Sequence, residues 1–161
     1  NKLGNVKIIR AMPNLPATIG EGVTALVSNG DTDNEKEEIG KLFDSIGSYI
    51  WLDDESEMDA VTAVSGSGPA YIFLFLKSMI DAGIKLGLDE EKAKTLAFKT
   101  FEGSVQLAAN SEESLEQLIS NVCSKGGTTE AAINSLKDNG LTGIVQTAIE
   151  AANRRSKELS E

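Results

Sequence analysis

Hydrophobic and polar positions follow two patterns, with short apolar runs in the first third of the chain and helical spacing afterwards. The short runs, each bounded by turn residues, predict strands; they are Val6–Arg10, Gly22–Val27 and Tyr49–Leu52. The stretch Met12–Pro16 carries two prolines and is expected to be extended or turned. A capping box of Thr32 and Glu35 predicts a helix that continues to about Ile46.

From Ser56 onward the spacing of apolar residues predicts helices only. The expected helices run from Pro69 to about Leu86, from an Asp89 cap to about Ala109, from Ser111 or Ser114 to near Cys123, from Glu130 to Asn139, and from Thr142 to Leu159. The helix that starts at Pro69 is apolar nearly all round, which predicts burial within a bundle or between subunits.

The expected fold is therefore mainly α, with an all-helical domain preceded by a few strand–helix–strand elements. Three short strands and one helix would leave one face of a sheet uncovered, so residues 1–55 are interpreted as the end of a larger α/β domain. Residues 56–161 are interpreted as a separate helical domain.

Charge and composition limit the classes of binding partner and the cellular compartment expected for this chain. The net charge of −10 argues against nucleic acid or an anionic membrane surface, because few cations are available to neutralise phosphates. A single cysteine, Cys123, excludes an internal disulfide and fits a reducing compartment such as the cytoplasm, and a buried structural thiol is favoured over a reactive one. We expect neither a signal peptide nor an apolar run long enough to span a membrane.

The sequence contains no histidine. This excludes Ser–His and Cys–His nucleophile systems and histidine metal ligands, and we expect no metal site. Chemistry must then use carboxylates, hydroxyls, backbone dipoles or a cofactor, and redox chemistry with a bound nicotinamide needs little more.

The segment Val122–Glu130 carries the main chemical signal. Two glycines allow a tight turn, and two threonines open the following helix, whose first N–H groups and dipole favour a small anion such as a carboxylate. The alternative is an ordinary helix start without a ligand.

Other polar segments permit two interpretations each. Ser65–Pro69, with two serines and two glycines, suits a small polar niche or simply close helix–helix contact. Glu55 lies in an acidic run that would normally be a solvated loop, and Glu112 suits the first turn of a helix. Asn121 and Ser124 flank the glycine turn, where either residue could merely cap a helix end.

Four motifs in this order and spacing resemble the pyrroline-5-carboxylate reductase family. They are Met-Pro-Asn-x-Pro from Met12, Ser-Gly-Ser-Gly-Pro-Ala-Tyr from Ser65, Ala-Gly-x-x-x-Gly-Leu from Ala82, and Gly-Gly-Thr-Thr from Gly126. The resemblance runs from about Val6 to the C-terminus. The family's Gly-rich dinucleotide fingerprint and most of its nucleotide-binding domain have no counterpart in this chain. The chain therefore looks like the last strands of the family's NAD(P)-binding Rossmann domain, residues 1–55, joined to its all-helical dimerisation and substrate-binding domain, residues 56–161.

The resemblance implies reduction of 1-pyrroline-5-carboxylate to L-proline with NADPH or NADH, in a homodimer that can assemble into a ring of dimers. It implies that the substrate carboxylate sits on the backbone N–H groups of Gly126, Gly127, Thr128 and Thr129 near Ser124, with Glu55 near bound proline. It further assigns the Thr129 hydroxyl to the ring nitrogen as the catalytic contact, and Asn121, Met12 and Asn14 to the cofactor; Glu112 stays unassigned.

One residue departs from the family pattern, because Lys125 stands where the family usually has proline. This change should loosen the turn, while the lysine charge favours an anionic substrate. Two alternatives stay open: a related NADP-dependent reductase of another imine or a 3-hydroxy acid, and, for the isolated chain, a non-catalytic helical dimerisation module.

Overall fold

The computed structural model describes residues 6–30 and 33–160. By packing, the chain forms two units. The first, the sheet unit, comprises residues 1–71 and 147–161, and the second, the helical unit, comprises residues 72–146. The expected boundary at residues 55 and 56 stays a prediction, and Thr32 of the expected capping box lies outside the described residues.

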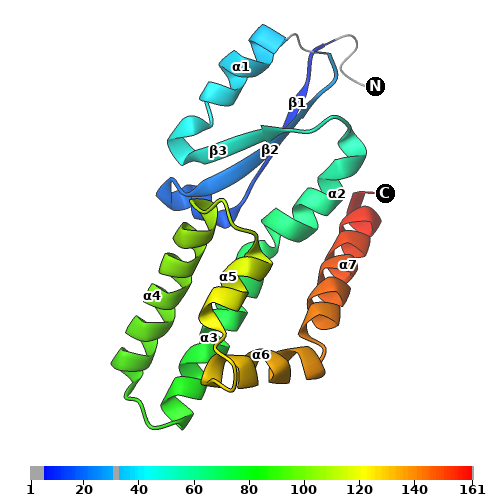
Figure 1. Ribbon diagram of the computed structural model, residues 1–161. Helices are drawn as coiled ribbons and strands as arrows, with labels where there is room; N and C mark the ends of the chain where they lie inside the picture. The colour runs from blue at the N-terminus through cyan, green and yellow to red at the C-terminus, as the bar shows by residue number, and fades with distance from the viewer. Residues whose placement is uncertain (1–5, 31–32, 161) are drawn as a thin grey trace. The chain divides into compact units, whose positions relative to one another are not determined.

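The sheet unit is built on three strands in the order β1-β2-β3 (Figure 1). They are β1 Ile9–Pro13, β2 Gly22–Ser28 and β3 Gly47–Trp51. β1 pairs antiparallel with β2 after the short 3-10 helix η1, Leu15–Ile19, and β2 pairs parallel with β3. β2, the central strand of the three, is buried along most of its length.

The first strand lies further along the chain than the sequence predicted. The expected strand was Val6–Arg10, whereas β1 is Ile9–Pro13, with Ile9 opposite Ser28 and Pro13 opposite Thr24. Pro13 is tolerated because it ends a strand at the edge of the described sheet, where its missing N–H costs no central ladder bond. The pairing partner β2, not the local pattern of β1, sets the register.

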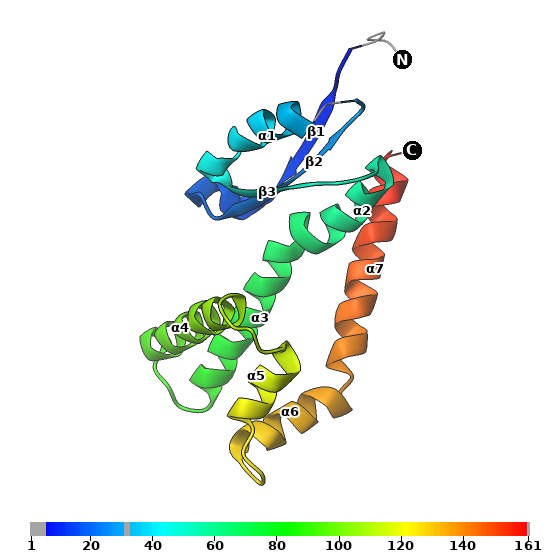
Figure 2. The same cartoon turned by 45° about the horizontal axis from the view of Figure 1, so that its top comes forward.

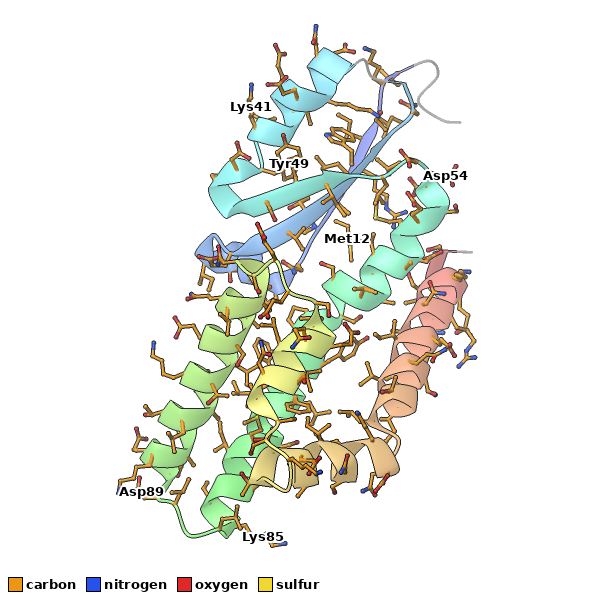
Figure 3. The ribbon with its side chains drawn as sticks, in the orientation of Figure 1. Met12, Lys41, Tyr49, Asp54, Lys85 and Asp89 are labelled. Carbon is orange, nitrogen blue, oxygen red and sulfur yellow. The ribbon has the colours of Figure 1, made fainter. Side chains whose placement is uncertain are left out.

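Helix α1, Asp33–Lys41, covers one face of the sheet. The Tyr49 ring lies against Gly40, and the ammonium group of Lys36 lies 5.3 Å from the centre of the Trp51 ring. Tyr49 and Lys41 are labelled on this side of the sheet in Figure 3. The helix ends five residues earlier than the predicted Ile46, because its last turn tightens into i→i+3 hydrogen bonds and a 3-10 turn, η2 Asp44–Ile46, follows.

The opposite face of the sheet is partly covered by α2, Met58–Val61, so it is not left bare as we expected. Met58 packs against Ala25 and Val27 of β2, with Leu52 and Met12 beside them. Met12 is labelled in Figure 3. Further along this face a pocket of about 350 Å³ remains, lined mainly by apolar side chains of β2, β3 and α2.

A continuous helical stretch follows the sheet. It comprises the 3-10 turn η3 Glu55–Glu57, α2, a π-helical turn η4 Thr62–Gly66, and α3 Gly68–Lys85. The end of the last helix belongs to the same unit, and there Ser156 Oγ donates a 2.6 Å hydrogen bond to Asp59 Oδ1.

The remaining helices confirm the expectation of an all-α arrangement after Ser56. They are α4 Glu90–Ala109, α5 Leu115–Val122, α6 Thr128–Asp138 and α7 Leu141–Ser160. Asp89 caps α4 by accepting from the Lys92 N–H, and Ser114, one of two predicted starts, caps α5 by accepting from the Gln117 N–H. α6 starts at Thr128, two residues before the predicted Glu130, and joins α5 to α7 (Figure 2).

Within the helical unit, α3 and α4 pack through small residues. A Cβ on Gly83 would lie 3.3 Å from the Ala93 Cβ, and Ala93 and Ala97 are among the few buried side chains of this unit. The Phe75 and Phe101 rings meet edge to face with centroids 5.7 Å apart.

Most apolar side chains of α3 nevertheless face solvent in the single chain. Leu74 is 67% exposed, and of the α3 side chains only Leu76 is buried. The predicted burial of this helix is therefore not achieved within one copy of the chain.

The stretch Glu55–Lys85 is 31 residues long and apolar enough to cross a membrane by length and composition alone. Our expectation that no apolar run reaches this length was wrong. Only 11% of the apolar window is buried.

Candidate functional site

The glycine turn between α5 and α6 forms a closed loop. The Gly127 N–H donates to the Ser124 carbonyl at 2.9 Å, and Gly126, the third residue of the turn, has φ +74°. This is the pattern of a type II β-turn, whose third position needs the positive φ that glycine adopts easily. Lys125 occupies the second position, which favours proline.

The second glycine is required for a different reason, close approach. A Cβ on Gly127 would lie 2.3 Å from Ser124 Oγ, so any side chain there would displace the serine hydroxyl. The sequence interpretation that both glycines free the backbone for a tight turn therefore holds for Gly126 alone, because Gly127 has an extended backbone with φ −83°.

Two of the four amides assigned to the substrate carboxylate are engaged within the loop. The Gly127 N–H binds Ser124 O, and the Gly126 N–H donates to Glu130 Oε2 at 2.6 Å. In the described part of the chain, the N–H groups of Thr128, Thr129 and Glu130 have no protein acceptor, because they belong to the first turn of α6. These three amides and the helix dipole make the strongest anion-attracting point of the loop.

Thr129 is half-buried and lines a pocket of about 400 Å³ between α4, α5 and α6. The pocket is otherwise mostly apolar, with Leu107, Leu118 and Ile133 in its wall. Thr128 and Ser124, by contrast, are exposed. The loop thus places one hydroxyl residue at an apolar wall, beside the open amides.

Asn121 lies on the last turn of α5 within a small polar network. Its side-chain N–H donates to Glu113 Oε2 at 2.9 Å, and its side-chain oxygen accepts from Gln117 Nε2 at 2.9 Å. Both halves of the amide are therefore oriented by neighbours. Glu112, the unassigned candidate, has no described hydrogen bond or ion pair.

Glu55 belongs to the sheet unit and is paired with a cation. Its carboxylate accepts a hydrogen bond from the Arg10 guanidinium of β1. Asp54, just before Glu55, and Glu57, two residues after it, form a capping box for this turn. Hydrogen bonds from the Ser56 side chain and N–H lower the pKa of Asp54. Glu55 is exposed, so the ion pair adds little stability but orients the side chain.

Asn14 and Met12 meet the π-helical turn. Asn14 Nδ2 donates to Ser65 Oγ at 3.3 Å, and Asn14 Oδ1 accepts from the Val23 N–H at 3.0 Å. The Met12 methyl group lies 3.0 Å from where a Cβ on Gly66 would be. The Ser65–Pro69 segment therefore provides close backbone approach together with a polar contact, and π-helical turns recur at functional sites.

The structure thus brings the predicted residues together in two groups. Ser124, Gly126, Gly127, Thr128 and Thr129 form one loop, with Asn121 on the helix before it. Glu55, Met12 and Asn14 lie in the sheet unit.

Sequence reasoning missed three contacts at these groups. Arg10 and Ser65 depend on pairings 45 and 51 residues apart, which no local signal reveals. Glu130 was taken only as a helix start, although a glutamate at the third helical position is a known capping signal. Among the described residues no group of three or more His, Cys, Asp or Glu side chains could hold a metal ion.

Comparison with known proteins supplies the context for this site. The family described as pyrroline-5-carboxylate reductase dimerisation matches residues 55–159. The chain is similar to the pyrroline-5-carboxylate reductase of Pseudomonas aeruginosa, with 46% identity over 155 residues, and to that of Pisum sativum, with 40% identity over 158 residues. These alignments cover 96% and 98% of the chain but only 57% and 58% of the relatives.

Solved structures agree with these alignments. The pyrroline carboxylate reductase of Plasmodium falciparum, solved with NADP bound, matches with a TM-score of 0.91 and 38% identity, covering 98% of this chain and 64% of that one. The pyrroline-5-carboxylate reductase of Coxiella burnetii matches with a TM-score of 0.94 and 38% identity, covering 99% and 60%. With most of its length matched by that family, the chain belongs to the pyrroline-5-carboxylate reductase dimerisation family.

Proposed function

We propose that the protein containing this chain is a pyrroline-5-carboxylate reductase, which reduces 1-pyrroline-5-carboxylate to L-proline with NADPH or NADH in the cytoplasm. The observation that carries the proposal is the loop at the start of α6, where three open amides lie beside Thr129. A site for one carboxylate next to the Thr129 hydroxyl suits a small cyclic imino acid. Family membership and the names of the relatives support the same activity.

The residues of the loop divide the work between binding and orientation. The carboxylate of the substrate accepts hydrogen bonds from the N–H groups of Thr128, Thr129 and Glu130, each charge-assisted contact contributing roughly 1–3 kcal/mol. The Thr129 hydroxyl accepts from the protonated ring nitrogen and fixes the plane of the imine. The apolar wall beside Thr129 excludes water from the ring carbons.

Three cofactor contacts are proposed in this chain, two of them, Met12 and Asn14, near the nicotinamide. Met12, Asn14 and Asn121 are the residues that would contact the cofactor, and two of them, Asn14 and Asn121, have both halves of their amides held by neighbours. The 161 residues contain no Gly-x-Gly-x-x-Gly loop for the pyrophosphate. When bound, a reduced nicotinamide supplies a hydride to the imine carbon, and the C=N bond becomes a C–N single bond.

The test is a reductase assay on the complete gene product. Purified protein with 1-pyrroline-5-carboxylate should consume NADPH or NADH and form L-proline in equal amounts. Thr129→Val, which keeps the shape of the side chain at the apolar wall, should lower kcat/KM about 10- to 100-fold, whereas Thr128→Val should change it far less. Wild-type rates in Thr129→Val would remove Thr129 from the mechanism.

Substrate choice separates the proposal from the related reductases. Cyclic imines without a carboxylate and 3-hydroxy acids should be turned over far more slowly, because they leave the open amides or the Thr129 hydroxyl unpaired. Faster reaction with either would favour the alternative reductase.

The 161-residue chain by itself should show no measurable turnover, because it lacks the pyrophosphate loop. The intact mass of the gene product in its source cells bears on this directly. A product heavier by most of a nucleotide-binding domain would support a working reductase, and a product equal to this chain would contradict it.

A second function, a helical dimerisation module, is favoured by the exposed apolar residues of α3. In this proposal two copies of the chain cover each other's α3, and the complete protein can assemble such dimers into a ring. Sedimentation of the purified protein measures the assembly, and a monomer at micromolar concentration would contradict it.

A further inference from the structure

One contact in the loop has no place in the mechanism above. The backbone N–H of Gly126 donates to Glu130 Oε2 at 2.6 Å, from the turn to the first turn of the following helix. We propose that Glu130 is a positioning residue that holds the Ser124–Gly127 turn closed, so that the first three amides of α6 are presented to a carboxylate ligand. The ligand part of this inference rests on the proposed function.

Glu130 is the side chain that the local sequence provides to hydrogen-bond the turn before this helix. In a capping box, the residue before the helix supplies a hydroxyl or carboxylate, and a glutamate three positions later binds back. Here the residue before the helix is Gly127, which has no side chain, and no side chain caps α6 in the described structure. The returning half of the box is present, shifted by one residue onto Gly126.

The turn needs such a brace because its own restraints are few. One backbone hydrogen bond, from Gly127 to Ser124, closes it. Its second position is Lys125, which lacks the fixed φ that proline would contribute. Gly126 at the third position is free to adopt many conformations once released.

Glu130 and the ligand use different donors. The two amides before the helix are consumed by Glu130 and Ser124, while those of Thr128, Thr129 and Glu130 point ahead without a protein acceptor in the described part of the chain. The Glu130 carboxylate therefore binds the Gly126 N–H and does not compete with the ligand for the N–H groups of the first helical turn. Binding should weaken, not strengthen, when the carboxylate is removed.

The experiment compares Glu130→Ala, Glu130→Gln and the double variant Lys125→Pro with Glu130→Ala in the complete gene product. The matched control is Glu91→Ala, which removes an exposed glutamate from the first turn of α4. Amide hydrogen exchange at Gly126 reports the brace, and KM for 1-pyrroline-5-carboxylate reports the presentation of the amides.

In Glu130→Ala the Gly126 amide should exchange about tenfold faster and KM should rise roughly tenfold, with kcat within about twofold of wild type. Glu130→Gln retains an acceptor oxygen and should recover most of both effects. In the double variant, Lys125→Pro should recover KM without slowing exchange, because proline restores the turn but not the acceptor. Glu91→Ala should leave both readouts unchanged.

A lower KM in Glu130→Ala would overturn the proposal by showing that the glutamate competes with the substrate. An unchanged KM beside faster exchange would also overturn it, since the brace would then not serve binding. If the wild-type protein has no reductase activity, the proposed function is wrong but the role of Glu130 is still open to test. Hydrogen exchange at the Gly126 amide would then decide whether Glu130 holds the turn.

Discussion

The sheet unit and the helical unit bury their apolar residues very differently. In the sheet unit, Leu26 is 0% exposed and packs within a strand that is buried on both faces, with Met58 closing one side. In the helical unit, the buried side chains are Leu76, Ala93 and Ala97, while large apolar residues of every helix face solvent. Both units carry well-formed secondary structure.

This difference in the burial of apolar side chains indicates which contacts stabilise each unit. Burial of apolar surface is the main favourable contribution to folding, so β2 and α2 stabilise the sheet unit within one chain. Helices α4 and α5 have side-chain caps, and several helices carry local ion pairs, but such contacts contribute only tenths of a kcal/mol to about 1 kcal/mol each. A second copy of the chain is the partner we propose for the uncovered apolar surface.

The largest effect is expected in the core of the sheet unit. Leu26→Ala should lower the free energy of unfolding by about 2–5 kcal/mol, because it removes buried methyl groups and leaves a cavity. Urea titration followed by circular dichroism measures this loss. Leu42→Ala, at a position 73% exposed, is the control and should stay within about 0.5 kcal/mol of wild type. An equal loss of unfolding free energy in both variants would contradict the assignment of Leu26 to a core and of Leu42 to the surface.

A charged substitution on α3 tests whether the apolar side chains of the helical unit are buried against a second copy of the chain. Leu74→Glu should shift the protein from dimer to monomer, because it would bury an unpaired carboxylate in the proposed interface. Sedimentation equilibrium at several concentrations measures the shift. Leu42→Glu, similarly exposed but on the sheet unit, should leave the dimer intact. An unchanged dimer in Leu74→Glu would remove this helix from the interface.

The glycine loop is locally tight within the loosely packed helical unit. Gly127→Ala should raise KM for 1-pyrroline-5-carboxylate at least tenfold, because the new Cβ would lie 2.3 Å from Ser124 Oγ and 2.9 Å from the Ser124 carbonyl oxygen, and the carbonyl cannot rotate away as the hydroxyl can. Gly126→Ala forces a side chain into a positive φ, with a strain of roughly 1–2 kcal/mol, and should act in the same direction. Gly103→Ala, inside α4 with nothing near its Cβ position, is the control. Wild-type KM in Gly127→Ala would contradict the observed loop geometry.

The smallest effect is expected at a helix cap. Hydrogen bonds from the Lys92 side chain and backbone N–H lower the pKa of Asp89, which is labelled in Figure 3. A lowered pKa in the folded state means that this carboxylate stabilises the fold above its ordinary pKa of about 3.9, and that the contribution is lost as pH falls through that value and the lower one. Asp89→Ala should therefore lower the urea midpoint slightly at pH 7 and hardly at all near pH 2. A larger difference at pH 2 would reverse the assigned sign.

Local signals predicted much of the helical unit and less of the sheet. Asp89 caps its helix as expected, and Ser114, one of two predicted starts, caps the next, because a cap is a contact within three residues that depends on the local sequence. The start of β1 was missed, because its register depends on Ser28 and Thr24 of another strand. The end of α1 was missed because the closing turn tightened around Gly40 and the loop before β3.

The candidate site divides in the same way. The turn at Gly126 and Gly127 was foreseen, since positive φ and close approach are both properties of glycine. The Arg10–Glu55 pair was not, because sequence separation hides it.

By itself, the sequence determined that helices follow Ser56, the Asp89 cap, the glycine turn and the family resemblance, all of which depend on short-range spacing or motif order. Only the tertiary structure decided which amides of the loop stay open, where Glu130 binds, and that α3 stays uncovered in one chain. These outcomes depend on which atoms meet after folding, and an apolar pattern states that a surface must be buried without stating what will cover it.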